Sequence, residues 1–188
     1  ERFDGGAHST WALVASMGTA RWSFALVALE EGGPSHHGGM LVAAGGLTGK
    51  GWATSEEAYD PVADEWAPIA SMATARVGCA GAALHGKAYV SGGQDSNNND
   101  LSSVEVFDPA MGHWAAAPPM GTARSSHAAA ALVVGGTARI YVSGGTISGN
   151  SPELATAEAL GADWHECNAT APGGGCTVCA ACCQSSYA

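Results

Sequence analysis

The chain has 188 residues, of which 46% are hydrophobic and only 13% are charged, and this excludes a disordered acidic tail. Its 17 acidic and 7 basic side chains give a net charge of −10, which excludes the basic surface that binding to nucleic acid or anionic lipid requires. Its apolar runs are shorter than the ~18 residues that a membrane span needs.

A repeat of about 50 residues runs through the chain. Each of three copies has a Trp, a Met six positions later and an Arg four positions after the Met, at residues 11–21, 66–76 and 114–124. A Gly pair follows an apolar run three times, at Gly45-Gly46, Gly92-Gly93 and Gly144-Gly145. A Glu-x-aromatic-Asp signature starts at Glu1, Glu57 and Glu105, and a weaker copy starts at Glu158. Three kinds of anchor in the same order indicate one repeated structural unit.

The segments between these anchors have the pattern of short β-strands. In the clearest copy, the small apolar run 77–84 is typical of a strand buried on both faces. Gly86 turns the chain, residues 87–91 form the next strand, and strands at 104–107 and from Trp114 follow. Four short strands per ~48 residues, separated by Gly and Pro, predict an all-β fold. Four-stranded units of this length are typical of propeller blades.

The anchors also carry a family resemblance. The Gly pair, the Glu-x-aromatic-Asp-Pro signature, the Trp and the Met-x-x-x-Arg sequence resemble the kelch repeat, and residues 72–120 are the best copy. The resemblance extends over residues 1–166 and implies a kelch-type β-propeller of four-stranded blades.

The expected blades follow one another along the chain. The last two strands of one blade and then three whole blades are expected at residues 1–17, 19–69, 74–117 and 122–167. This is about three and a half blades, whereas a propeller needs at least four to close. We therefore expect residues 1–166 to be the C-terminal part of a larger propeller, a partial kelch propeller in this chain, and residues 167–188 to be a separate cysteine-rich tail.

The anchors predict specific structural roles. The Gly pairs are expected to adopt positive φ where a strand leaves the crowded inner ring. Tryptophans of the repeat are expected to wedge apolar area between blades, at Trp66, Trp114 and Trp164. Glu105 is expected to form a buried ion pair with Arg76 or Arg124, tying strands together.

The tail holds five of the six cysteines, at Cys167, Cys176, Cys179, Cys182 and Cys183. Disulfides suit a short Gly-rich segment that builds no core of its own, while zinc binding and free thiols stay open as alternatives. Asn168 begins a glycosylation sequon, and the sequon and the cysteines together favour an oxidising compartment. Cys79, by contrast, is expected to be a small buried residue of an inner strand.

The sequence shows no catalytic constellation, and we expect no cofactor and no metal. The Gly-rich run 45–51 departs from a phosphate-binding loop at Ala44 and Gly51. His127 lies on a predicted inner strand that could face a central channel, but no partner residues accompany it.

The loops that follow the Gly pairs, residues 47–55, 94–101 and 146–153, are polar and differ from one another. Such loops are where partners bind on a rigid scaffold. Trp52 is the candidate aromatic anchor. A polar and acidic patch is the second candidate contact, formed by Asp95, Asn97, Asn98, Asn99 and Asp100.

These features favour a non-enzymatic protein-interaction scaffold in an extracellular or lumenal assembly, with proteins or other subunits of a complex as partners. Two alternatives stay open. The first is the substrate-recognition kelch domain of a ubiquitin-ligase adaptor, which would be cytoplasmic and whose repeats residues 72–120 resemble. The second is a carbohydrate-active or copper-oxidase-like propeller, which would need a metal or a substrate pocket in the channel.

Overall fold

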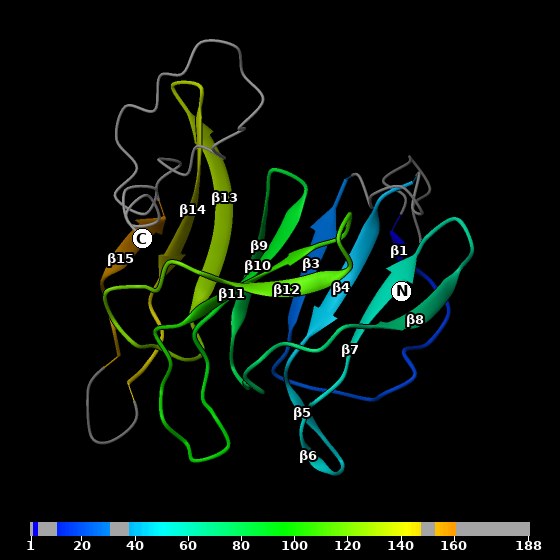
Figure 1. Ribbon diagram of the computed structural model, residues 1–188, viewed down its shortest axis with the longest axis horizontal. Coiled ribbons are helices and arrows are strands. Elements are labelled where there is room, and N and C mark those ends of the chain that lie inside the picture. Colours follow the sequence, from blue (N-terminus) through cyan, green and yellow to red (C-terminus); the bar gives the residue numbers. More distant parts are fainter. Residues whose placement is uncertain (1, 4–10, 31–37, 148–152, 161–188) are drawn as a thin grey trace, which may run out of the picture.

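The computed structural model describes residues 2–3, 11–30, 38–147 and 153–160, and every regular element in these ranges is a β-strand (Figure 1). The strands form consecutive antiparallel sheets. The prediction of an all-β, partial β-propeller is therefore confirmed. Among the described residues, no helix has the length and hydropathy that a membrane crossing requires.

Two complete four-stranded blades occupy the middle of the chain, each with its strands hydrogen-bonded in chain order. The first blade consists of β3 (Ala25–Leu29), β4 (Met40–Ala44), β7 (Glu56–Asp60) and β8 (Glu65–Ile69). The second blade consists of β9 (Ala80–Leu84), β10 (Lys87–Ser91), β11 (Val104–Asp108) and β12 (His113–Ala117). The strand predicted at 77–84 begins three residues later than expected, because Val77 forms an isolated bridge with Gln94 at the end of the blade.

Partial blades flank these two. The half-blade before them pairs β1 (Arg2–Phe3) with β2 (Trp11–Ala12). The third blade contains β13 (Ala128–Val134), β14 (Thr137–Ser143) and β15 (Ala157–Leu160). A short hairpin of β5 (Leu47–Thr48) and β6 (Gly51–Trp52) projects from the first blade. The strand expected around Trp164 and the tail 167–188 lie outside the described residues, so the boundary at residue 166 stays a prediction.

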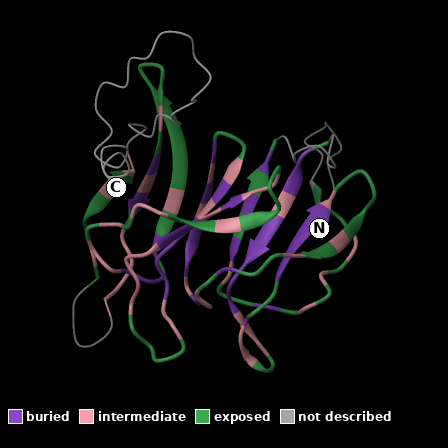
Figure 2. Ribbon diagram, viewed as in Figure 1, coloured by how far each residue is buried: buried purple, intermediate pink, exposed green. Residues whose placement is uncertain are grey.

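The core lies where the inner strands of neighbouring blades meet, as the buried segments of β3, β4 and β10 show (Figure 2). Val27 of the first blade packs over Gly81 of the second, where a Cβ atom would lie only 2.5 Å from the valine Cγ2. Small residues on β9 therefore let the blades approach closely. This close approach accounts for the high Ala and Gly content of the chain.

An ion pair lies inside each of the three blades, with nitrogen–oxygen distances of 2.6–2.7 Å, in Arg21–Glu57, Arg76–Glu105 and Arg124–Glu158. The first two pairs are buried, whereas Glu158 of the third pair is half-buried. The sequence left Arg76 or Arg124 open as the partner of Glu105, and the structure selects Arg76. Burial alone would raise the pKa of Glu57, but hydrogen bonds from the Arg21 guanidinium and from the Gly18 N–H hold that pKa below its usual value.

Each ion pair also forms hydrogen bonds with backbone groups. The Glu105 carboxylate accepts the N–H groups of Ala73 and Thr74, at 2.7 and 3.1 Å, from the segment that leads into the blade. The Arg76 guanidinium donates to the carbonyl of Gly92 at 2.9 Å. One ion pair thus joins the leading segment, the third strand and the Gly pair, and the other two blades repeat these contacts.

The Gly pairs have the positive φ angles predicted for them. Gly45 and Gly46 have φ of 71° and 93°, and a Cβ atom on Gly45 would lie 2.5 Å from the carbonyl oxygen of Arg76 in the next blade. The Gly46 N–H donates to that same oxygen at 2.8 Å. The Gly pair is therefore the point where the backbones of two blades touch.

Trp66 and Trp114 link each blade to the one before it through hydrogen bonds. The Trp66 indole N–H donates to the carbonyl of Ala15 at 3.1 Å, and the Trp114 indole N–H donates to the carbonyl of Ala70 at 2.8 Å. Each indole also packs against an aromatic ring of its own blade, with ring centroids 5.2–5.3 Å apart.

The sequence left open whether His127 faces a central channel, and the structure buries it between the second and third blades. Its Nε2 lies 2.9 Å from the Ser91 Oγ, which in turn donates to the carbonyl of Ala80. The imidazole therefore carries its proton on Nε2 and donates to the serine. Burial, with the nearby Arg124 charge, lowers the pKa of His127 to about 4.

Replacing Arg76 by Met is expected to destabilise the protein by about 3–5 kcal/mol, because the Glu105 carboxylate stays buried without its counter-charge. Urea unfolding measures this change. The matched control is Lys87→Met, which breaks the more exposed Lys87–Asp108 pair and is expected to cost about 1 kcal/mol or less. Equal effects of the two substitutions would contradict a special role for the buried pair.

Stability is expected to fall as the pH drops from 6.5 towards 4, because the unfolded chain then protonates His127 while the folded chain keeps it neutral. The loss reaches up to about 3 kcal/mol. His127→Gln retains a donor for Ser91 but does not titrate, so its unfolding free energy should depend less on pH over this range. Parallel pH profiles for the two proteins would refute the buried neutral imidazole.

Candidate functional site

The connections that follow the Gly pairs emerge on one side of the blades. In Figure 1 the β5–β6 hairpin and the connection that leaves β10 lie at the lower side, opposite the β9–β10 and β13–β14 turns. We call the lower side the loop face. It is the side on which two of the loops predicted to bind a partner lie, 47–55 and 94–101, while residues 148–152 of the third predicted loop lie outside the described residues.

Three equivalent backbone bridges form the frame of the loop face. In each, the residue after the repeat Arg exchanges two N–H···O bonds of 2.8–3.0 Å with the residue after the Gly pair, in Trp22–Leu47, Val77–Gln94 and Ser125–Thr146. The backbone geometry is the same in the three blades, but the side chains differ completely. A constant frame with variable side chains is the arrangement by which a scaffold displays a recognition surface.

The bridge of the first blade is apolar. Trp22 pairs with Leu47, and Leu47 pairs on its other side with Trp52 of β6. Residues directly opposite one another on antiparallel strands project to the same face, so the three side chains form one row. Trp22 is 62% exposed, while Leu47 and Trp52 are half-buried. The row offers a large aromatic surface with a rigid base.

The bridge of the second blade is polar. Val77, Gln94 and Asp100 form its row. Between the last two, the Asp95 carboxylate accepts the backbone N–H groups of Asn97 and Asn99, at 2.8 and 2.9 Å. The Asn99 side chain also donates a hydrogen bond to Asp95, and this bond lowers the pKa of Asp95 most. Together with the two backbone bonds, it holds that pKa below its usual value. The loop is therefore fixed by its own aspartate.

The predicted contact residues divide into two groups in the structure. Asn97, Asn98 and Asn99 are exposed. Trp52, Asp95 and Asp100 are half-buried, and Asp95 organises its loop. The role of these six residues in binding stays a prediction.

Trp22 was missed by the sequence analysis, although it is the most exposed aromatic side chain of the loop face. The signal was present, because Trp22 follows the repeat Arg directly, where the other copies have Val77 and Ser125. The role of Trp22 was hidden because this residue precedes β3 and lies outside the three loops that follow the Gly pairs. Only the bridge to Leu47 shows that it belongs to the loop face.

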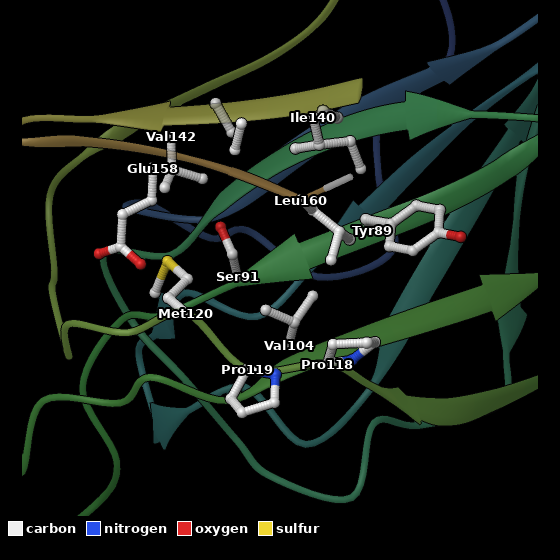
Figure 3. A pocket seen from close by; sticks show the side chains of 13 residues that line it. Tyr89, Ser91, Val104, Pro118, Pro119, Met120, Ile140, Val142, Glu158 and Leu160 are labelled. Atoms are coloured by element: carbon white, nitrogen blue, oxygen red, sulfur yellow. The ribbon is translucent and has the colours of Figure 1, made fainter. Parts of the chain in front are cut away.

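The cavity between the second and third blades has the character of a packing gap. It has a volume of about 80 Å³ and is lined mainly by apolar side chains such as Val104, Ile140 and Leu160 (Figure 3). The Glu158 carboxylate and the Ser91 hydroxyl in its lining already have partners, since Glu158 binds Arg124 and Ser91 binds His127. The cavity therefore presents no side chain that is poised for catalysis.

The described residues contain no group of three or more His, Cys, Asp or Glu side chains that could hold a metal ion. Cys79 is buried with a free thiol, as expected, and burial raises its pKa to about 11, so the thiol stays protonated and unreactive. The five tail cysteines and Asn168 lie outside the described residues, so the disulfide and glycosylation hypotheses stay predictions.

Comparison with known proteins agrees with the repeat. Residues 75–121, which contain the whole second blade, match the family model described as the Kelch motif. A mouse protein, Kelch-like protein 35, is 38% identical to this chain over 78 residues, which are 39% of this chain and 12% of that protein. The matched stretch thus spans a small part of this relative's own length.

Proposed function

Since this chain belongs to the kelch-repeat family, we propose that it is a non-enzymatic protein-interaction scaffold whose partner binds the loop face. The observation that carries the proposal is the set of three bridges, identical in backbone and different in side chain. A purely structural bridge needs no 62%-exposed tryptophan, since the exposed part of a large apolar side chain does not stabilise the fold.

The chemistry of the loop face suggests the kind of protein it suits. The Trp22–Leu47–Trp52 row suits an apolar side chain, because aromatic surfaces on rigid supports are typical binding hot spots. The neighbouring loop adds Asp95 and Asp100, and the chain has a net charge of −10. A partner segment with an apolar anchor and basic neighbours would be complementary to this surface.

A second candidate is the substrate-recognition kelch domain of a ubiquitin-ligase adaptor. It is favoured by the similarity of 78 residues to Kelch-like protein 35, and it uses the same loop face. The two hypotheses differ in compartment, since a scaffold in an extracellular or lumenal assembly would have oxidised tail cysteines and a cytoplasmic adaptor would have free ones. Counting the thiols of the denatured, unreduced natural protein separates them.

Replacing Trp22 by Ser is expected to weaken partner binding at least tenfold while leaving the melting temperature nearly unchanged, because the side chain is 62% exposed. The measurement is quantitative affinity capture from the natural source on immobilised wild-type and variant protein. Met111→Ser is the matched control, since Met111 is also an exposed apolar residue, at 68%, but lies in the β11–β12 turn. Equal loss of the same partners by both variants, or by neither, would contradict the proposal.

A further inference from the structure

One deeply buried carboxyl group of the first blade takes no part in the three ion pairs. Glu56 is 1% exposed and directly precedes Glu57, the acid of the ion pair. At the same place in the repeat, the second blade has Val104 and the third blade has Ala157. The first blade therefore buries an ionisable group where the other two have apolar side chains, and a charge buried without a partner is costly.

Glu56 has few polar contacts within the described residues. Its Oε2 accepts the N–H of Met72 at 3.3 Å, from the segment that leads into the second blade. The Arg21 charge acts on Glu56, but the Arg21 guanidinium is already bound to Glu57 at 2.7 Å. Burial raises the pKa of Glu56 above its usual value, and the hydrogen bonds and the Arg21 charge offset only part of that rise.

The other charged or titratable groups around Glu56 do not supply a counter-charge. From the second blade, Cys79 lies close enough to be affected by a charge on Glu56, and its thiol stays protonated. Arg76, which also acts on that thiol, is bound to Glu105. Lys50 is exposed at the tip of the β5–β6 hairpin, and β8 sets an apolar residue opposite Glu56. Ionisation of Glu56 therefore leaves a buried charge without a partner of its own.

The loop that precedes β7, residues 47–55, is held less firmly than its equivalents. In the second blade, the repeat Arg donates to both the carbonyl and the hydroxyl of Ser103, at 3.1 and 3.3 Å, and the third blade repeats both bonds at Thr156. Ser55 is the equivalent residue of the first blade, but among the described residues Arg21 bonds only to Gly45 and to its ion-pair partner. The ion pair of the first blade thus does not hold the end of its loop.

Two hydrogen bonds close the end of this loop on the protein. The N–H of Ala53, which is 2% exposed, donates to the carbonyl of Gly46 at 2.8 Å. The Ser71 hydroxyl donates to the carbonyl of Thr54 at 2.8 Å. By contrast, β7 is paired with β4 on one side and with β8 on the other. A charge on Glu56 therefore reaches water by opening the loop rather than by moving the strand, because segments with few bonds open at the lowest free energy.

We propose that Glu56 is a buried proton-binding site that regulates the loop 47–55. The neutral carboxyl group keeps the loop closed, and loss of its proton to water opens the loop where it joins β7. Because the closed form retains the proton, opening becomes more favourable as the pH rises above 4.5, the ordinary pKa of a glutamate. The loop carries Leu47 and Trp52 of the aromatic row, so the same proton regulates partner binding there, and this last step rests on the proposed function.

Hydrogen exchange of the Ala53 amide, expressed as protection relative to the unfolded chain, tests the proposal without any partner. Between about pH 5 and about pH 8 the protection should fall by roughly threefold or more, because release of one proton on opening shifts the equilibrium by up to ~tenfold per pH unit. Leu101 is the internal control. Its N–H makes the equivalent bond, also of 2.8 Å, in the blade that has Val104 in place of Glu56, so its protection should not show this fall.

Two substitutions to glutamine separate this role from a general effect of charge. Glu56→Gln keeps an acceptor for the Met72 N–H but does not ionise. Ala53 should then be more protected than in the wild-type protein at about pH 7, and its protection should follow that of Leu101 at every pH. Glu65→Gln makes the same chemical change at an exposed residue of β8 and should behave as the wild-type protein.

The proposal is overturned if Ala53 and Leu101 depend on pH alike in the wild-type protein, a result that needs no variant. It is equally overturned if Glu56→Gln lowers the protection of Ala53 at neutral pH, since Glu56 would then be ionised and stabilised by Arg21. Neither result involves a partner of the loop face, whose binding the Trp22→Ser variant tests separately.

Discussion

The ion pair between Arg and Glu within each blade is the interaction on which the other features depend. A guanidinium and a carboxylate taken out of water are costly unless each finds several further partners. Here Glu105 finds them in the N–H groups of Ala73 and Thr74, and Arg76 finds them in the carbonyls of Gly92 and Ser103. The need to satisfy both charges therefore fixes where the leading segment, the Gly pair and the third strand must lie.

The loop face follows from that constraint. Once Arg76 is fixed, the next residue, Val77, is set opposite Gln94, and the bridge between them forms. The same sequence of contacts sets Trp22 opposite Leu47 in the first blade. Side chains at the bridges are then free to vary, because the frame is held by residues that do not reach the surface. Stability and recognition are thus assigned to different residues of one repeat.

Much of the fold could be predicted because each recurring residue of the repeat has one main structural role. Positive φ at Gly92 and Gly93, the wedge made by Trp114 and the buried pairing of Glu105 all follow from residue type and spacing. The site was harder to predict, because Trp22 has no distinguishing context and becomes part of it only through a bridge 25 residues along the chain. The surroundings of His127 could not be predicted for a similar reason, since its partner, Ser91, belongs to another blade.

The most direct test of this account is the exchange rate of the Ala73 and Thr74 amide hydrogens in the native protein. Both lie outside strands and bind the buried Glu105 carboxylate, whereas Val62 and Ala63 make similar but exposed bonds to Asp60, which is half-buried. If the ion pair organises the blade, Ala73 and Thr74 exchange as slowly as the β10 amides, and far more slowly than Val62 and Ala63. Equal, fast exchange at all four positions would contradict the account.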